Sequence, residues 1–382
     1  MTIDLSLSDE NRLVQSTVRE YAAAEIEPHI REWDEKHEVH REVFERMAEL
    51  GFLGAPIPEE FGGAGLDYVS LGILCEELER ADTAFRVVMS VHVGLNSLTL
   101  LQWGSDYQKQ HFLVPQAKGE KLATFGLTEP GVGTDAANLA TTARRDGDSY
   151  VLNGAKMWIS LADVADHFLV FATLDRAQKH RSITAFIVER GMPGFTTGTI
   201  HGKLGIRASD TAEIAFEDVR VPQSNLVGKE GKGFYQLMHF FDTTRIMVAA
   251  QGLGLAEACL DTSVKYCKER TAFGTALGNY QLTQKKLTEM AIMIEALRGL
   301  VYKSGWLVDN GTPDFTLAAM AKFYSGQTAV FCANNAVELH GGYGYIDEYS
   351  VQKWYRDAKI LELYEGTKEA EIMTVGRALM SK

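Results

Sequence analysis

The stretch Phe125-Gly-Leu-Thr-Glu-Pro-Gly-Val-Gly-Thr-Asp135 decides the fold and points to a ligand. Its first residues are typical of a strand end, and Pro130, Gly131 and Gly133 then break the strand into a loop whose backbone can approach a ligand closely. Such a loop presents consecutive N–H groups to an anionic or carbonyl-rich group. A Gly-rich turn between strands is also ordinary turn chemistry, so the spacing alone leaves both interpretations open.

A second stretch, Lys156-Met-Trp-Ile-Ser160, follows after a short polar interval. Trp158 would supply a flat aromatic wall beside the loop. Thr128 and Thr134 add hydroxyl groups that can donate or accept hydrogen bonds. The two stretches together predict a ligand cradle.

These two stretches resemble the flavin-binding signature of the acyl-CoA dehydrogenase family, T-E-P-G-x-G-[ST]-D followed by W-I-[ST]. Near the C-terminus, Leu339-His-Gly-Gly-Tyr-Gly-Tyr345, Tyr355-Arg-Asp-Ala358 and Tyr364-Glu-Gly-Thr367 follow in the family's order and approximate spacing. The resemblance runs from the first expected helix to the last. It implies an FAD cofactor, an acyl-CoA substrate, a homotetramer and an electron-transfer flavoprotein as electron acceptor.

Composition limits the other function classes. The chain has 382 residues and a net charge of −13, which argues against nucleic acid as the main partner because phosphate binding needs a basic field. A local cluster of Arg and backbone N–H groups can still hold a pyrophosphate. Cys75, Cys259, Cys267 and Cys332 include no C-x-x-C pair, as expected for packed thiols in a reducing compartment. We see no signal or transit peptide and expect no membrane span, so the expected location is the cytoplasm.

Patterning divides the chain into three parts. Residues 1–120 and 229–382 have apolar residues at helical spacing, whereas residues 121–228 contain short β-branched or aromatic runs between Gly, Asp or Pro turns. We expect an α+β multidomain protein with a helical N-terminal domain, a middle β-barrel or β-sandwich domain and a C-terminal bundle, of four helices as the resemblance implies. This is the acyl-CoA dehydrogenase fold. Helices are expected over 69–81 and along an apolar run at 84–103. Strands are expected over 122–127, 140–143, 150–152, 168–172, 183–188 and 213–216.

Motifs for other chemistries do not occur. No strand-linked G-x-G-x-x-G opens a helix with an acidic residue about twenty positions later, so a nicotinamide cofactor has no support. The sequence also lacks G-x-x-x-x-G-K-[ST], H-E-x-x-H and G-x-S-x-G. We therefore expect neither a metal site nor a serine nucleophile.

Glu365 is the predicted catalytic residue. An apolar helical run precedes it, and Gly366 is expected to end that helix. A carboxylate at such an end would lose hydration, which raises its pKa toward the range useful for a base. An exposed Glu is the ordinary alternative at such a position. The resemblance implies that Glu365 removes the α-proton of an acyl thioester and that hydride passes from the β-carbon to flavin N5.

The resemblance also assigns binding roles residue by residue. Glu365 N–H is implied to hold the thioester carbonyl together with a flavin hydroxyl. Other family members carry the base just before the arginine equivalent to Arg245, where this chain has Thr244. The implied cofactor-binding residues are Phe125, Leu127, Thr128, Gly133, Thr134, Trp158, Ile159, Ser160, Arg270, Phe273, Gln281, Glu338, Gly341, Gly342, Thr367 and Glu369. The implied substrate-binding residues are Arg86, Ser90, Thr134, Asp242, Arg245 and Gly366.

Two positions depart from the short-chain pattern. Glu338 stands where the family usually has Gln, and an ionised carboxylate cannot donate a hydrogen bond and repels phosphate. Arg86 interrupts an apolar run, where Asp82 or Glu79 could be its partner. The segment Glu79-Arg-Ala-Asp-Thr-Ala-Phe-Arg86 also resembles that of glutaryl-CoA dehydrogenases, whose arginine holds the distal carboxylate of the substrate.

These observations predict FAD-dependent α,β-dehydrogenation of a short or compact acyl-CoA to the trans-2-enoyl-CoA. Lys203-Leu-Gly-Ile-Arg207 and the stretch from Tyr355 resemble short-chain acyl-CoA dehydrogenases, which implies a short-chain substrate. The resemblance around Arg86 instead implies a dicarboxylic one such as glutaryl-CoA, with or without decarboxylation. A cyclic acyl-CoA is a further alternative. An acyl-CoA oxidase, a flavin-dependent lyase and a catalytically silent flavoprotein subunit also use such a scaffold.

Overall fold

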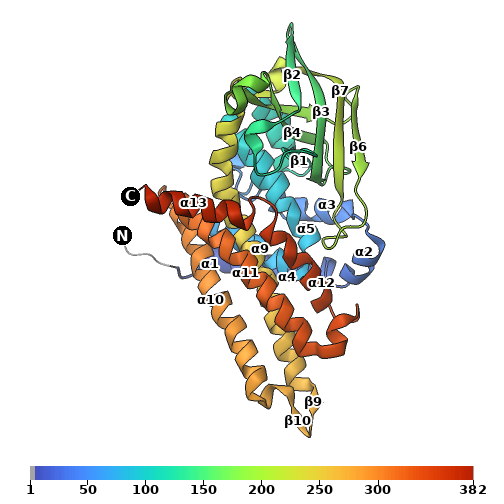
Figure 1. Ribbon diagram of the computed structural model, residues 1–382, viewed down its shortest axis with the longest axis vertical. Coiled ribbons are helices and arrows are strands. Elements are labelled where there is room, and N and C mark those ends of the chain that lie inside the picture. Colours follow the sequence, from blue (N-terminus) through green and yellow to red (C-terminus); the bar gives the residue numbers. More distant parts are fainter. Residues whose placement is uncertain (1–4, 382) are drawn as a thin grey trace.

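Helices, a sheet and further helices follow one another along the chain in this computed structural model, which describes residues 5–381 except the side chain of Asp242 (Figure 1). Figure 1 shows the sheet at one end and the long helices α9, α10 and α11 extending away from it. The N-terminal helices lie between these parts. The predicted order of helical, β and helical domains is confirmed.

Side-chain caps fix the start of the main N-terminal helices. Ser8 Oγ accepts a hydrogen bond from the Asn11 N–H at 3.0 Å, and Asn11 Oδ1 accepts one from the Ser8 N–H. Asp67 Oδ1 accepts from the Ser70 N–H at 2.6 Å and caps α4. The first elements are α1 (Asp9–Glu25), α2 (Ile30–Lys36), α3 (Arg41–Glu49), η1 (Phe52–Gly54), η2 (Glu59–Phe61) and α4 (Tyr68–Ala81).

A continuous helical wall comes next. It consists of α5 (Thr83–Val88), the π-helical segment η3 (Met89–Ser97) and α6 (Leu98–Trp103). By length and composition alone, the stretch Thr83–Trp103 is apolar enough to cross a membrane. Inside the protein 83% of its apolar window is buried, which is the behaviour of a core helix. The short helices α7 (Asp106–Gln108), η4 (Lys109–Leu113) and α8 (Val114–Ala117) follow it.

The middle of the chain forms a sheet of eight strands. Its order is β6-β7-β3-β2-β4-β5-β8, and β1 pairs in parallel with β4. Each of the six expected strands overlaps an observed one. The pattern missed β6, where a single large apolar residue precedes Thr and Gly, and the two-residue strand β8. The strands are β1 (Ala123–Gly126), β2 (Thr142–Asp146), β3 (Ser149–Ser160), β4 (His167–Thr173), β5 (Ile183–Glu189), β6 (Phe195–Thr199), β7 (Thr211–Pro222) and β8 (Leu226–Val227).

Long helices make up the rest of the chain. One face of α10 is largely inside, with Met290, Ile294, Leu297 and Val301 buried. The helices α10 and α11 end immediately before Asn310 and Gly341. The elements are α9 (Gly233–Glu269), the hairpin β9 (Thr271–Ala272) and β10 (Thr275–Ala276), α10 (Gln281–Asp309), α11 (Phe315–His340), η9 (Gly341–Tyr345), α12 (Val351–Ala358), η10 (Lys359–Glu362) and α13 (Lys368–Met380).

The helix expected to end at Gly366 ends earlier. α12 stops at Ala358, and one 3₁₀ segment carries the chain to Glu362. Thr367 then begins α13 by accepting a hydrogen bond from the Ala370 N–H at 3.3 Å. Glu365 therefore lies in a turn between two helices, with a φ of 49°.

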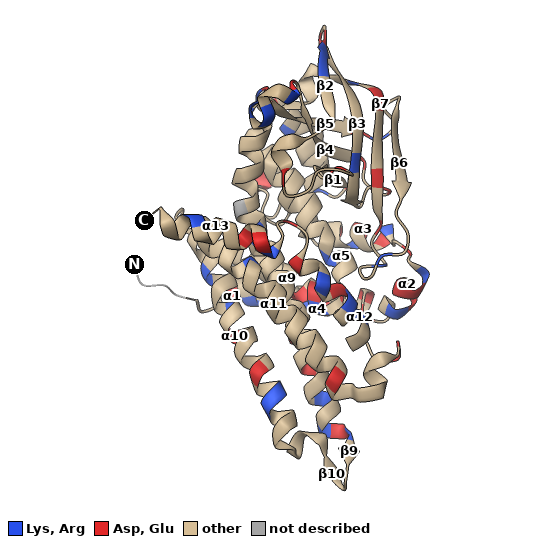
Figure 2. Ribbon diagram, viewed as in Figure 1, with Lys and Arg blue, Asp and Glu red and all other residues tan. Residues whose placement is uncertain are grey.

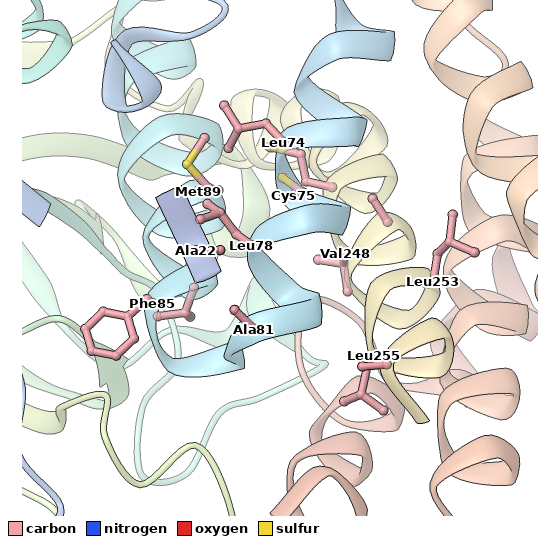
Figure 3. Packing of buried hydrophobic residues seen from close by; sticks show 14 of the residues in the cluster. Ala22, Leu74, Cys75, Leu78, Ala81, Phe85, Met89, Val248, Leu253 and Leu255 are labelled. Carbon is pink, nitrogen blue, oxygen red and sulfur yellow. The ribbon is translucent and has the colours of Figure 1, made fainter. Parts of the chain in front are cut away.

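The main core joins the N-terminal helices to the C-terminal ones. Figure 3 shows α4 residues Leu74 and Leu78 between Met89 of the helical wall on one side and Val248 of α9 on the other. All four are fully buried. Burying such side chains contributes about 1.5–3 kcal/mol each, so this packing holds the wall and α9 in a fixed relation.

A buried histidine ties the helical wall to the sheet. His92 Nδ1 accepts from the Ala123 N–H at 2.9 Å, and its Nε2 lies 3.1 Å from the Gln116 carbonyl oxygen. The Gln116 side chain also contacts His167 Nδ1 at 3.2 Å. Burial lowers the pKa of both His92 and His167 to about 4. Both imidazoles are therefore neutral at pH 7.

We expect acid to weaken this junction. Because the folded pKa of His92 lies below that of an unfolded histidine, its contribution to stability is present above about pH 6.5 and is lost as pH falls toward 4. The full loss should be about 3 kcal/mol, of which roughly 2 kcal/mol falls between pH 7 and pH 5. Urea unfolding at pH 7 and pH 5 measures it for the native chain and for His92→Gln, which keeps a donor and an acceptor but does not titrate. An equal loss in both proteins would contradict the assignment.

Candidate active site

The loop after β1 exposes its backbone on one side. Phe125 and Leu127 are buried in the sheet's core, so their side chains anchor the loop from below. Glu129 and Val132 pair with each other through two backbone hydrogen bonds of 3.0 and 3.1 Å. At Gly131 a Cβ atom would meet nothing within 4 Å. The loop thus has open space above its backbone, as a ligand cradle requires.

A buried ion pair closes this loop. Lys156 Nζ lies 2.8 Å from Glu129 Oε1 and 3.1 Å from the Leu127 carbonyl oxygen. The same carboxylate accepts from the N–H groups of Ala140 and Thr141 at 2.6 and 2.9 Å. Burial lowers the pKa of Lys156 to about 8, although Glu129 acts in the opposite direction. One carboxylate therefore joins both ends of the loop to β3.

Trp158 stands out from the sheet beside this loop. The β3–β7 register shifts between Lys156 and Ile159, and Trp158 takes a φ of 63°. A bulge of this kind redirects a side chain out of the strand's alternation. Trp158 is 59% exposed although it is the largest apolar residue type. Its neighbour Ile159 is buried and Ser160 is half-buried.

Glu365 points its carboxylate inward. Oε2 is buried and has no hydrogen-bond partner among the described residues. Burial raises the pKa of Glu365, and the charges of Arg86 and Lys322 and the hydroxyl groups of Ser90 and Thr244 act against this rise. The direction of the predicted pKa shift is thus confirmed, although the residue lies in a turn and not at a helix end.

Arg86 lies in the same interior and is 0% exposed. Its Nη1 donates to Gln251 Oε1 at 2.8 Å, and its Nη2 donates to the Met247 carbonyl oxygen at 2.6 Å. The Tyr364 hydroxyl also donates to Gln251 Oε1. Within the described part of the chain, no carboxylate lies within 4.0 Å of the guanidinium. Its two hydrogen bonds therefore go to neutral acceptors, and the charges of Glu79 and Glu365 act on it without a direct ion pair.

Neither partner suggested by helical spacing forms an ion pair with Arg86. Asp82 pairs with Lys353 at 3.0 Å. Glu79 Oε1 accepts from the Thr83 hydroxyl at 2.5 Å, and burial raises the pKa of Glu79 to about 8. Figure 2 shows charges of both signs around the middle of the molecule, near the labels α4, α9 and α12.

A second group of predicted residues lines a cavity of about 520 Å³ at the far end of the helices. Arg270, Glu338, Gly341 and Gly342 are among its walls. Tyr266 and His340 stack there with ring centroids 4.1 Å apart, and the Arg270 guanidinium lies over the Tyr343 ring at 5.6 Å. Stacked rings and an arginine suit an aromatic base and its phosphates.

The remaining predicted residues have varied surroundings. Phe273 is 100% exposed and Gln281 is exposed, so neither contacts the cavity in a single chain. Glu338 pairs with Lys286, whose hydrogen bond lowers the pKa of Glu338.

Thr128 and Gly366 are half-buried, whereas Gly133, Thr134 and Glu369 are exposed. Ser90 is buried, Arg245 Nε lies 3.3 Å from Glu371 Oε1, and the Asp242 side chain is outside the described residues.

The donors at these two places fit FAD. The open backbone of the loop and Trp158 suit a flat, carbonyl-rich ring, and the arginine and aromatic rings of the cavity suit a nucleotide. Among residues 5–381 no group of three or more His, Cys, Asp or Glu side chains is placed to bind a metal ion. The four cysteines are buried and unbridged.

Sequence reasoning missed several residues of this site. Gln251 lies in the apolar part of α9, where nothing in the pattern distinguishes it. Thr244 is distinguished in the sequence only as the position where other members of the resembled family carry the base. Lys156 and Lys322 carried a signal, because a lysine at a buried position of a strand or in an apolar helix needs a partner. Both are fully or almost fully buried.

Sequence models of three domains match the chain. They are described as the acyl-CoA dehydrogenase N-terminal domain over residues 8–120, the middle domain over residues 124–219 and the C-terminal domain over residues 231–380. A short-chain specific acyl-CoA dehydrogenase of Clostridium acetobutylicum is 43% identical over 373 residues, which cover 98% of each chain.

Two solved structures are also similar. One, described as an electron transferring flavoprotein of Acidaminococcus fermentans, has a TM-score of 0.98 and 41% identity and covers 100% of both chains. The other is a glutaryl-coenzyme A dehydrogenase in complex with glutaryl-CoA. It has a TM-score of 0.97 and 37% identity and covers 99% of this chain and 97% of that one.

Replacing Lys156 with Met should lower the free energy of unfolding by roughly 3–5 kcal/mol, because Glu129 would stay buried without its partner. The double variant Lys156→Met, Glu129→Gln should recover part of this loss. Urea unfolding measures both values, and the exposed Lys229→Met is the control. A double variant no more stable than Lys156→Met would contradict the expectation that the unpaired Glu129 charge causes the loss.

Proposed function

The chain belongs to the acyl-CoA dehydrogenase family, and from this premise we propose that Glu365 is the base that takes the α-proton of a short or compact acyl-CoA thioester. The enzyme is an FAD-dependent oxidoreductase that acts on the CH–CH group of an acyl-CoA. The proposed product is the trans-2-enoyl-CoA. When bound, FAD supplies the acceptor for the hydride that leaves the β-carbon.

One observation carries the assignment of the base. Glu365 Oε2 is buried with no hydrogen-bond partner among the described residues, in an interior that also contains Arg86 and Lys322. A buried carboxylate oxygen without a partner is costly, and such groups are retained where a ligand uses them. Its raised pKa brings it closer to that of an effective base near neutral pH.

The proposed role of each group follows from its chemistry. Glu365 accepts the α-proton, and its N–H donates to the thioester carbonyl oxygen as negative charge develops there. Trp158 and the open loop orient the reacting groups, so that a bimolecular reaction becomes a step within one complex. The apolar wall around Ser90 excludes water.

We also propose how the cofactor is held and how the enzyme is assembled. The loop at 125–135 and Trp158–Ser160 would hold the ring, with Thr367 and Glu369 nearby, and the cavity around Arg270 would hold the nucleotide. Phe273 and Gln281 are exposed in one chain, which supports their role toward the FAD of a neighbouring subunit in a homotetramer. The proposed domain boundaries are 120/121 and 228/229. An electron-transfer flavoprotein is the proposed acceptor, and the cytoplasm is the proposed location.

A dicarboxylic acyl-CoA is the second candidate substrate. The Arg86 guanidinium is fully buried, and its two observed hydrogen bonds go to neutral oxygens. Its Nε has no hydrogen-bond partner within the described residues, nor has the buried Gln251 Nε2. A distal carboxylate would compensate the charge and occupy these donors. The similarity to a glutaryl-CoA dehydrogenase structure agrees with this proposal.

Glu365→Gln should lower turnover roughly 10²- to 10⁴-fold, because the amide cannot take the proton. FAD content should remain unchanged. The measurement is the anaerobic rate at which butyryl-CoA bleaches the bound flavin. The exposed Glu60→Gln is the matched control. Bleaching at the native rate in Glu365→Gln would exclude Glu365 as the base.

Arg86→Ala should weaken glutaryl-CoA binding by about 10²-fold or more if the distal carboxylate pairs with Arg86. Butyryl-CoA binding should change much less. Equilibrium titration of the flavin spectrum gives both dissociation constants, and Arg86→Lys shows whether charge alone suffices. Equal losses for the two ligands would remove the dicarboxylic proposal and leave the short-chain one.

A further inference from the structure

A single buried lysine of α11 contacts the turn that carries Glu365. Lys322 is 1% exposed, and its Nζ donates a hydrogen bond to the Gly366 carbonyl oxygen. Its neighbours along the helix, such as Ala319, Ala321 and Ser325, are buried small residues. A lysine in such surroundings loses hydration, so its position needs a specific reason.

The turn itself is held from two sides. Glu365 and Gly366 have positive φ values of 49° and 101°. A Cβ atom at residue 366 would approach Glu371 Oε1 to 2.3 Å, so the turn is pressed against the buried Glu371 side chain near the start of α13. On the other side Lys322 holds the Gly366 carbonyl oxygen. A left-handed conformation at a non-glycine residue is costly and persists only when its surroundings enforce it.

We propose that Lys322 is a positioning residue for the base: its ammonium group holds the carbonyl of Gly366, fixes the left-handed turn that directs Glu365 inward, and places a positive charge facing the Glu365 carboxylate. This inference rests on the proposed function of Glu365. It adds Lys322 as a cation near the base, which also acts on Glu365 by holding the turn that carries it.

The charges around Glu365 and Lys322 determine whether loss of the Lys322 charge raises or lowers the pKa of Glu365. Arg86 on α5 and Lys322 on α11 are the cations that act on Glu365, and the hydroxyl groups of Ser90 on η3 and Thr244 on α9 act in the same direction. Cys75 on α4 and Tyr364 also interact with Glu365. Burial lowers the pKa of Lys322, and so does the positive charge of Arg245. Negative charges act in the opposite direction and come from Glu371, Glu365 and Glu362.

Removing the Lys322 charge therefore raises the pKa of Glu365. The carboxylate must be ionised to accept a proton, so the rate would begin to fall at a higher pH than in the native enzyme. An opposite charge near a carboxylate favours its ionised form. We therefore expect the acid limb of the pH–rate profile to move to higher pH when the Lys322 charge is removed.

Three variants separate the charge from the hydrogen bond. Lys322→Met removes both, Lys322→Gln keeps a donor without the charge, and Lys322→Arg keeps both. Lys203→Met is the matched control, because Lys203 also donates to backbone carbonyls, those of Ile206 and Ser209, but belongs to the middle domain. The measurement is the rate of flavin bleaching by butyryl-CoA from pH 5 to pH 9, with FAD content and melting temperature for each protein.

Lys322→Met should lose roughly tenfold or more in the bleaching rate at pH 7, and its acid limb should move up. Lys322→Gln should show the same movement with a smaller loss at high pH, and Lys322→Arg should keep the native profile. If Lys322→Met does not fold, Lys322→Gln still tests the charge. An unmoved acid limb in Lys322→Gln, or a loss equal at every pH and not restored by Arg, would overturn the inference. Only an active Glu365→Gln would overturn the proposed base.

Discussion

Ionised groups inside an apolar interior are the constraint on which this structure depends. A buried charge loses its hydration and needs an opposite charge or several hydrogen bonds. Lys156 has Glu129, and Lys353 has Asp82 and Asp357 at 3.0 and 2.6 Å. Arg86 instead donates to neutral oxygens, and Glu365 Oε2 has no hydrogen-bond partner among the described residues. The paired groups stabilise the fold. Arg86 and Glu365, which have fewer partners, lie where a bound substrate could supply the missing interactions.

Backbone strain occurs at three residues of the predicted site. Trp158, Phe273 and Glu365 all have positive φ values although none is glycine. Each such conformation costs on the order of 1–3 kcal/mol, which the surrounding structure must offset. For Trp158 the offset comes from the sheet pairing on either side of the bulge, and for Glu365 from the packing of α11 and α13 around the turn. Strain at these places indicates that side-chain direction matters more there than local stability.

Much of the fold could be predicted from the sequence, because it depends on local periodicity. The apolar spacing in α10 and the Pro and Gly breaks near 310 and 341 are short-range signals, and the helix bounds agree with them. The stretches 125–135 and 156–160 were instead matched by their resemblance to a family signature, because their spacing alone also fits an ordinary turn. The environment of Arg86 could not, because spacing favoured Asp82 and Glu79, whereas Gln251 and Met247 come from a helix about 160 residues away. Nor does the local sequence show that the helix before Glu365 ends at Ala358.

The π-helical segment Met89–Ser97 acts as a spacer of fixed pitch. Ser90 at one end interacts with Glu365, and at the other end the Asn96 side-chain amide donates to the Thr124 carbonyl oxygen at 2.8 Å, one residue before the loop stretch begins. A π-turn contains more residues than an α-turn, so the segment sets a different angle between Ser90 and Asn96 than an α-helix would. A segment of the same length with α-helical hydrogen bonds would therefore turn these two side chains in other directions relative to each other.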